Sequence, residues 1–173
     1  MSEERPFKPL NIAVLTVSDS RSPAEDSSGD LLTARLEGVG HHLYERELLP
    51  DDLYQIRAAV SRWIAAADCD VVITTGGTGL TGRDGTPEAV SVLFDKTIDG
   101  FGETFRAVSF RQIGSSTLQS RAIAGVANRT YCFVLPGSTG ACRDAWDNLI
   151  ESQLDYRTRP CNLVELMPRL TER

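Results

Sequence analysis

Short β-rich runs alternate with amphipathic segments through the first half of this chain, and that alternation restricts the possible folds more than any other feature. Residues 12–17, 42–49 and 70–74 are predicted as strands. Residues 28–37 and a segment that opens after Pro50 have the apolar spacing of helices. The pattern predicts an α/β domain with three layers, in which a mostly parallel sheet carries helices on both faces.

The second half of the chain is less regular. Residues 86–94, 103–110 and 139–154 are predicted as helices, and Thr86 is expected to cap the first of them, with Pro87 at its first position. Residues 114–120 are predicted to form a polar loop, and residues 122–127 and 131–135 a hairpin or a pair of strands. The length of 173 residues fits one domain. We expect a flexible arm over residues 1–9, a single domain over residues 10–163 and a tail over residues 164–173.

Charge and cysteine spacing argue against several classes of protein. The formal net charge is -6 and no basic stripe is present, so we expect no nucleic-acid partner. The sequence lacks an apolar run of about 18 residues and an N-terminal secretory signal, so we expect no membrane span and a cytoplasmic protein. A zinc site is not expected, because the two histidines lie far in sequence from the four cysteines, which are Cys69, Cys132, Cys142 and Cys161.

Three polar loops follow predicted strands, at residues 18–22, 75–84 and 136–138. Ligands of open α/β sheets bind beyond the carboxyl ends of the strands, so these loops are the candidate site. The loop at residues 75–84 carries four glycines and three threonines within its first eight residues. Glycines let backbone N–H groups approach an anion closely, which predicts a phosphate-binding loop. A merely structural turn is the alternative.

The same loop contains the spacing Gly77-x-Gly79-x-x-Gly82 of the dinucleotide fingerprint. That fingerprint requires a helix opening within the glycines and an acidic residue at the end of the next strand. Here residues 83–85 separate the glycines from the predicted helix, and no acidic residue has the required place. A Lys-Ser/Thr pair, which a P-loop needs, is also missing. A nicotinamide-binding oxidoreductase remains an alternative function.

Two carboxylates flank the candidate site. Asp84 follows the glycines, and Asp51 follows the second predicted strand. A carboxylate beside bound phosphates is repelled unless a metal intervenes, and Mg²⁺ prefers one or two carboxylates plus phosphate oxygens. The alternatives are a helix cap for Asp51 and a turn residue for Asp84. Arg83 is expected to meet phosphate or to be solvated, and Ser138 to belong to a turn that caps the last helix.

Five further features of the sequence are the blocks Thr75-Gly-Gly-Thr-Gly79, Arg83-Asp-Gly-Thr-Pro-Glu-Ala89, Gly100-Phe-Gly-Glu103, Ser120-Arg121 and Leu135-Pro-Gly-Ser138. Taken together, in their order and spacing, these blocks resemble the MoaB/MogA family of molybdenum cofactor biosynthesis proteins. The resemblance runs from residue 12 to about residue 162, and the segments 116–122 and 158–162 are most similar to the MoaB branch.

The resemblance implies a molybdopterin-binding, MogA-like α/β fold that assembles as trimers or hexamers. It implies that the protein adenylylates molybdopterin with ATP and Mg²⁺ and releases pyrophosphate, and it makes other molybdenum cofactor enzymes candidate partners. A carrier that binds the pterin without chemistry is the alternative. Asp51 and Asp84 match the family's catalytic and magnesium positions. The implied substrate-binding and nucleotide-binding residues are Ser18, Asp19, Thr75, Gly76, Gly77, Thr78, Gly79, Ser120, Arg121, Pro136, Gly137 and Ser138.

Overall fold

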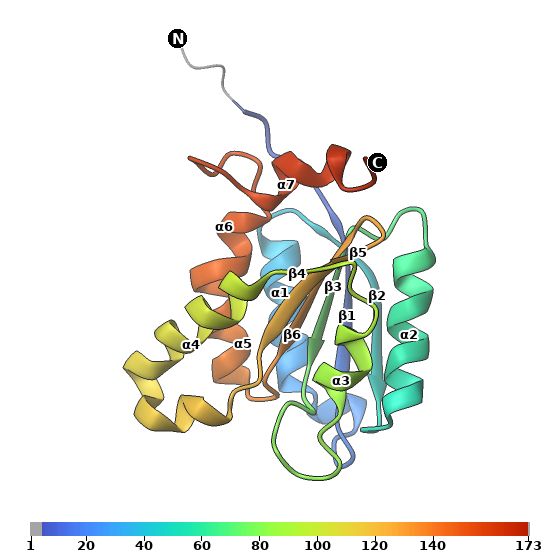
Figure 1. The fold of residues 1–173 in the computed structure, drawn as a ribbon, viewed down its shortest axis with the longest axis vertical. Helices are drawn as coiled ribbons and strands as arrows, with labels where there is room; N and C mark the ends of the chain where they lie inside the picture. The colour runs from blue at the N-terminus through green and yellow to red at the C-terminus, as the bar shows by residue number, and fades with distance from the viewer. Residues whose placement is uncertain (1–4, 173) are drawn as a thin grey trace.

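The computed structural model describes residues 5–172 and contains one six-stranded sheet with helices on both faces (Figure 1). The strand order is β2-β1-β3-β6-β5-β4. The first four strands in that order are parallel, whereas β5 runs antiparallel to both of its neighbours. The predicted fold class is therefore confirmed. The strands are β1 (Asn11–Val17), β2 (His42–Leu49), β3 (Val71–Thr75), β4 (Lys96–Thr97), β5 (Ile123–Ala127) and β6 (Thr130–Leu135).

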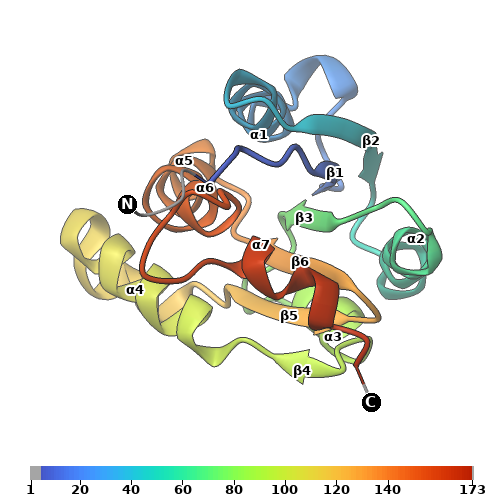
Figure 2. The ribbon, with the colours of Figure 1, turned by 90° about the horizontal axis from the view of Figure 1, so that it is seen from above.

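Five longer helical segments cover the sheet, and short helical turns connect or extend them. Figure 2 shows α1, α4 and α5 on one side of the sheet and α2 and α3 on the other. The α-helices are α1 (Ser27–Gly38), α2 (Leu53–Ala65), α3 (Thr86–Ser91), α4 (Asp99–Ile113), α5 (Thr139–Ala145), α6 (Glu151–Gln153) and α7 (Leu163–Leu166). The others are η1 (Pro23–Glu25), η2 (Gly114–Gln119), the π-helical turn η3 (Trp146–Ile150), which joins α5 to α6, and η4 (Met167–Arg169).

The alternation of side chains along each strand divides the core into two layers. On β1, Ile12 and Val14 face the layer that contains α1, α4 and α5, whereas Ala13 and Leu15 face the layer that contains α2 and α3. All four side chains are fully buried. Burial of an isoleucine, valine or leucine side chain contributes about 1.5–3 kcal/mol, so a central strand buried on both faces is strongly held.

The helix after Thr86 is shorter than predicted and is capped differently. Gly85 is its N-cap, Thr86 lies inside the first turn, and α3 ends at Ser91 rather than at residue 94. The chain leaves the helix through two tight turns, in which the Leu93 amide donates to the Val90 carbonyl and the Phe94 amide to the Ser91 carbonyl. This exit is required because the Asp95 amide must reach the Val126 carbonyl of β5.

Two other predictions about this region were wrong. Helix α4 begins at Asp99 and not at residue 103, because the glycines of this segment lie within the helix. A Cβ on Gly102 would lie 2.7 Å from the Ala122 carbonyl oxygen, so glycine at this position allows close packing of the helix against that carbonyl. The predicted polar loop over residues 114–120 is largely the 3-10 helix Gly114–Gln119.

The terminal segments meet at the end of the sheet opposite the glycine loop (Figure 1). Residues 1–4 of the predicted arm and residue 173 of the predicted tail lie outside the described residues, and the flexibility of both stays a prediction. Arg5 forms an ion pair of 2.8 Å with Glu165, and Val164 of α7 is buried in the core. Within residues 5–172, no helix has both the length and the apolar character to cross a membrane.

Candidate functional site

The three predicted loops meet at one edge of the sheet because β1, β3 and β6 are adjacent, parallel and in register. Thr16 pairs with Thr75, and Thr75 pairs with Leu135. The loops that follow these residues therefore leave the sheet side by side, at the lower end of the view in Figure 1. The sequence prediction that they form one region is confirmed.

The glycines at the start of the loop permit contacts that other residues would block. Gly76 and Gly77 have φ values of 100° and 64°, in the left-handed region that glycine adopts readily. The Gly76 amide donates to the Leu135 carbonyl at 3.1 Å, and a Cβ on Gly76 would lie 2.1 Å from the Val17 carbonyl oxygen. The glycine loop is thus held against the ends of both neighbouring strands.

Two consecutive backbone amides of this loop are not used by the described part of the protein. Among the described residues, the N–H groups of Gly77 and Thr78 have no hydrogen-bond partner. Successive free amides next to a left-handed residue form a concave anion-binding nest. The Thr75 hydroxyl is not part of it, since this residue is fully buried and donates to the Pro136 carbonyl at 2.9 Å.

Asp51 lies beneath this nest and is not the helix cap. Asp52 caps α2, because its carboxylate accepts the amides of Tyr54 and Gln55. Asp51 Oδ1 accepts the Gly85 amide at 3.2 Å. Asp51 Oδ2 and Thr86 Oγ1 lie 2.6 and 2.2 Å from the position a Cβ would take on Gly77, so both oxygens press against that glycine.

Polar groups around Asp51 are incompletely paired. The pKa of Asp51 is raised above its ordinary value by burial and, to a smaller extent, by the negative charges of Asp84 and Asp19. The buried Thr86 hydroxyl has no hydrogen-bond partner within the part of the chain that the structure describes. Buried polar groups are normally satisfied, so this spot fits a missing polar ligand.

Asp84 makes the contacts of a turn residue. Its Oδ2 accepts the amide and the hydroxyl of Thr81 at 2.8 and 2.6 Å, and these bonds lower its pKa. The carboxylate folds back over the glycine loop, where a Cβ on Gly79 would lie 2.6 Å from Oδ2. Asp84 is close enough to raise the pKa of Asp51, but in this state its carboxylate is occupied by Thr81.

Asp19 connects the loop after β1 to the glycine loop and to the segment that follows β2. Its carboxylate receives two hydrogen bonds from the Arg83 guanidinium, at 3.0 and 2.8 Å, and accepts the Asp51 amide at 2.9 Å. Arg83 is thus paired with a carboxylate, a partner that the sequence did not suggest. The two side chains are 67% and 43% exposed, so the pair contributes little to stability.

Of the remaining predicted residues, Ser18 and Ser138 have local roles in turns, whereas Ser120 and Arg121 contact other segments of the chain. Ser18 Oγ accepts the amides of Ser20 and Arg21 at 3.3 and 3.1 Å. Ser138 caps α5 by accepting the Ala141 amide at 3.1 Å, as one of the sequence alternatives proposed. The carbonyl of Ser120 accepts from Arg106, and the Arg121 side chain turns toward the glycine loop.

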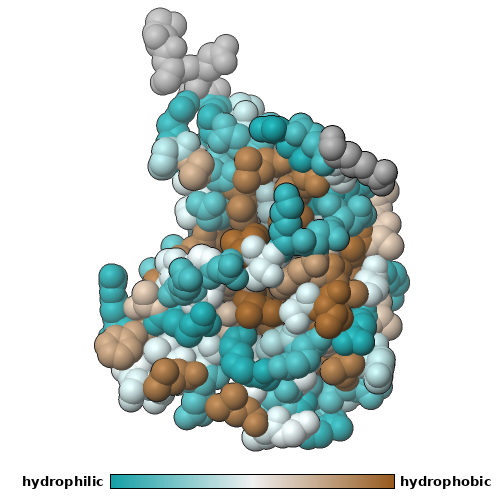
Figure 3. Space-filling view, viewed as in Figure 1, coloured by the Kyte–Doolittle hydropathy of each residue, from teal (hydrophilic) through white to brown (hydrophobic). Residues whose placement is uncertain are grey.

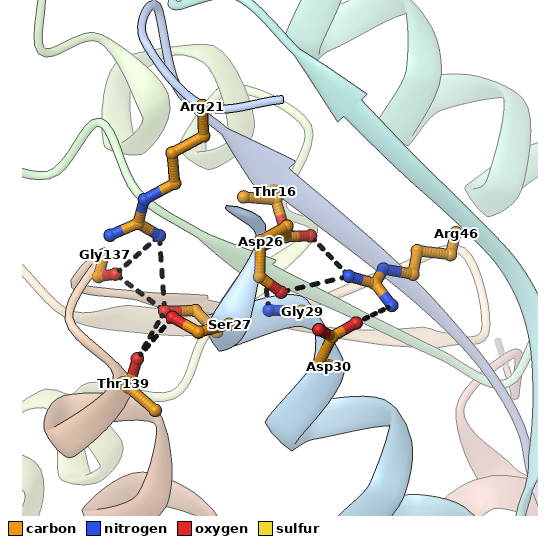
Figure 4. Close-up of polar contacts among 10 residues, drawn as sticks. Thr16, Arg21, Asp26, Ser27, Gly29, Asp30, Arg46, Gly137 and Thr139 are labelled. Carbon is orange, nitrogen blue, oxygen red and sulfur yellow. Dashed lines mark hydrogen bonds and ion pairs between the residues drawn. The ribbon is translucent and has the colours of Figure 1, made fainter. Parts of the chain in front are cut away.

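Sequence reasoning missed a second polar cluster at the same edge, which centres on Asp26 (Figure 4). Asp26 is buried and caps α1 by accepting the Gly29 amide at 2.9 Å. It also accepts from Thr16 Oγ1 at 2.8 Å and from Arg46 at 2.7 Å. Burial opposes its charge, yet these three donors together lower its pKa. An acidic residue before the apolar spacing of a helix is the signal that could have found it.

The same cluster supports the Gly137 turn from below. Arg21 and the Ser28 hydroxyl both donate to the Gly137 carbonyl, at 3.3 and 2.9 Å. The hydroxyls of Ser27 and Thr139 lie 2.9 Å apart and connect the starts of α1 and α5 (Figure 4). These contacts fix the third loop of the candidate site, because Gly137 in turn lies against Gly76.

A separate apolar cavity of about 380 Å³ contains none of the predicted site residues. It lies between the start of α4 and the segment 148–153, and Phe101, Phe133 and Leu163 contribute to its wall. Figure 3 shows apolar side chains reaching the surface on this face of the molecule.

The sheet order, the two helical layers and a glycine-rich loop at the carboxyl edge define an open α/β domain whose candidate ligand site lies beyond the ends of its parallel strands. The family described as probable molybdopterin binding domain matches residues 13–156, and the chain belongs to this family. The resemblance predicted from the five sequence blocks is thereby confirmed.

Within this family the chain is similar to the B proteins of molybdenum cofactor biosynthesis. It is 55% identical over 156 residues to molybdenum cofactor biosynthesis protein B of Escherichia coli (strain K12), covering 90% of this chain and 92% of the relative. A crystal structure of a molybdenum cofactor biosynthesis protein B superposes with a TM-score of 0.84 at 45% identity, covering 87% of this chain and 94% of the other. The tungsten cofactor synthesizing protein MoaB from Pyrococcus furiosus superposes with a TM-score of 0.76 at 38% identity, covering 85% and 93%.

Proposed function

We propose that this protein acts in molybdenum cofactor biosynthesis by binding molybdopterin and transferring an adenylyl group from ATP to its terminal phosphate. The observation that carries the proposal is the free amide pair of Gly77 and Thr78 beside the incompletely paired Asp51. Family membership supplies the pterin as the second substrate.

The reaction needs little covalent chemistry from the protein. A terminal phosphate oxygen of molybdopterin forms a bond to the α-phosphorus of ATP, the bond from that phosphorus to the bridging oxygen breaks, and pyrophosphate leaves. Such transfers depend on positioning and on donors aimed at the oxygens where negative charge develops. The rigidly held amides of the glycine loop fit that task, and the loops after β1 and β6 would contact the substrates at its sides.

The residues present fit a magnesium ion that is bound largely through its substrate. Among the described residues there is no group of three or more His, Cys, Asp or Glu side chains able to hold a metal. Mg²⁺ commonly uses one or two carboxylates and completes its coordination with phosphate oxygens and water. Asp51 would hold it, and Asp84 would join after releasing Thr81. The ion would neutralise phosphate charge.

A direct assay tests this function. Purified protein is incubated with molybdopterin, ATP and Mg²⁺, and adenylylated product and pyrophosphate are measured by chromatography and mass spectrometry. We expect both products from the wild type and at least a tenfold lower rate from Asp51→Asn, which loses a charged contact that is worth roughly 1.5–3 kcal/mol. Asp52→Asn is the matched control: asparagine also caps helices, so its rate should remain close to that of the wild type.

The other functions predict different results from the same protein. A carrier would bind the pterin saturably and produce no pyrophosphate, with binding insensitive to Asp51→Asn. A nicotinamide enzyme would be stabilised against heat by NAD. We do not favour the latter, because α3 begins at Thr86, beyond the glycines, and the next strand, β4, lies at the far edge of the sheet.

A further inference from the structure

Arg121 gathers the carbonyl groups of the glycine loop. Its Nε donates to the carbonyls of Thr78 and Gly79 at 3.1 and 2.9 Å, and its Nη2 donates to the carbonyl of Asp84 at 3.0 Å. These three carbonyls come from the beginning and the end of one loop, so a single guanidinium connects its two ends.

The remaining edge of the guanidinium is paired as well. Arg121 Nη1 forms an ion pair with Glu88 on α3, and the Arg121 side chain is 27% exposed. All three of its nitrogens thus have partners in the protein. The carboxylate of Glu88 balances the positive charge of Arg121. This weakens the electrostatic attraction that the guanidinium could exert on a bound phosphate.

The contacts of Arg121 with the loop carbonyls affect how well the loop can bind an anion. Carbonyl oxygens carry partial negative charge and would repel a phosphate if they faced it, whereas a guanidinium holds several of them in a fixed fork. With the carbonyls of residues 78 and 79 held toward Arg121, the loop keeps the conformation in which the amides of Gly77 and Thr78 have no protein partner.

We propose that Arg121 is a positioning residue, which shapes the glycine loop for phosphate through the loop carbonyls and does not itself touch the ligand. The family resemblance assigned Arg121 to the substrate-binding set, and this role differs from direct contact. The inference rests on the proposed function in one respect, that the glycine loop binds phosphate groups.

The substitution Arg121→Lys distinguishes a direct contact with phosphate from a positioning role. An ammonium group retains the positive charge but lacks the planar fork that reaches three carbonyls at once. A direct phosphate contact would therefore be largely preserved in Arg121→Lys, whereas a positioning role would be lost in Arg121→Lys and Arg121→Gln alike.

Arg106 provides a matched control on the neighbouring helix α4. Its guanidinium donates to the carbonyls of Ser120 and Ala122, on either side of Arg121, at 3.4 and 3.2 Å. Arg106→Gln removes one positive charge and two carbonyl contacts from the same segment without altering a bond to the glycine loop.

The experiment measures phosphate binding and loop protection in the full chain. Binding of inorganic pyrophosphate and of ATP is followed by calorimetry, and amide hydrogen exchange is followed over residues 76–84. We expect both Arg121 variants to bind pyrophosphate about tenfold more weakly and to exchange faster in the loop, since bonds to a charged group are lost. Arg106→Gln should remain within about twofold of the wild type in both measurements.

Three results would overturn the inference. These are wild-type affinity in Arg121→Lys, weaker binding with unchanged loop exchange, and absence of pyrophosphate binding to the wild type. Exchange outside the loop shows whether each variant is folded, and if Arg121→Gln is not, Arg121→Lys decides alone. If pyrophosphate binds as expected but adenylyl transfer is absent, the proposed function fails while the role of Arg121 stands.

Discussion

A buried aspartate, Asp26, and a half-buried one, Asp51, lie at the same edge of the sheet and have opposite surroundings. Asp26 receives a backbone amide, a hydroxyl and a guanidinium, and its pKa is lowered (Figure 4). Asp51 receives one backbone amide, faces two other carboxylates, and its pKa is raised. The charge on Asp26 is compensated within the protein, whereas the charge on Asp51 is only partly compensated there, as its proposed role at a Mg²⁺ ion requires.

Whether the charge of a carboxylate is compensated by protein groups distinguishes structural from candidate functional residues more clearly than its burial does. A compensated carboxylate holds its neighbours in place, as Asp26 holds the start of α1 against Arg46 of β2. An uncompensated one costs stability and persists where a ligand supplies the missing charge. The following predictions test this contrast.

The largest effect is expected from removing the compensated carboxylate. Asp26→Ala leaves the guanidinium of Arg46, which is 26% exposed, without its buried partner and removes the cap of α1. We expect the free energy of unfolding to fall by about 3 kcal/mol, as measured by urea denaturation. A loss as small as that of an exposed pair would show that Asp26 is not compensated by these contacts, and the contrast with Asp51 would fail.

The next effect concerns His41, a buried residue whose neutral form is favoured in the folded protein, and it tests how stability changes at acidic pH. His41 is buried, its Nδ1 accepts the Leu10 amide at 3.1 Å, and burial lowers its pKa from 6.5 to about 4. The unfolded chain takes up the proton first, so stability is present above pH 6.5 and is lost as the pH falls toward 4. This loss amounts to about 3 kcal/mol.

Urea denaturation at several pH values between 7 and 4 measures this loss. In His41→Asn the amide oxygen can still accept from Leu10 but nothing titrates, so the slope of stability against pH should flatten. Since Asp26 has a lowered pKa, its own contribution disappears at lower pH, as the pH falls through its folded value. An unchanged slope in His41→Asn would assign the acid sensitivity to the carboxylates.

Removal of the charge from Asp51 should have the opposite sign to removal of Asp26. Its pKa is raised in the folded state, so the ionised form opposes folding at neutral pH. We expect Asp51→Asn to raise the free energy of unfolding slightly, by less than about 1 kcal/mol, while adenylyl transfer is lost. If Asp51→Asn destabilises the protein as Asp26→Ala does, the two carboxylates are both structural.

The sequence predicts the framework well because the framework is local and periodic. The apolar runs at residues 12–17 and 70–74 locate two strands, and the glycines after Thr75 locate the loop that follows the second, without reference to distant parts of the chain. The same reasoning placed Asp51 and Asp84 near one another, since the carboxyl ends of parallel strands share an edge.

What the sequence could not predict depends on contacts between distant segments. Arg121 bonds residues that lie 37 to 43 positions away, and the partner of Arg83 lies 64 positions away. The sequence predicts that a helix begins after Gly102, but this glycine lies within α4, where its missing side chain makes room for the Ala122 carbonyl. Such pairings appear only when the elements are packed together.

The smallest effect on stability, and the finest test of the contrast, concerns the hydroxyl beside Asp51. Thr86→Val keeps the shape of the side chain but removes a buried hydroxyl that has no partner among the described residues. Replacing an unsatisfied group with an apolar one is nearly neutral or stabilising, so the melting temperature should not fall.

In contrast, the affinity for ATP with Mg²⁺ should fall several-fold if the ligand satisfies this hydroxyl, because a hydrogen bond is worth about 1 kcal/mol. Thr86→Ser is the matched control and should retain the affinity. Calorimetry and thermal unfolding measure the two quantities. A lower melting temperature with unchanged affinity would mean that the hydroxyl serves the fold, and the polar surroundings of Asp51 would then be as self-sufficient as those of Asp26.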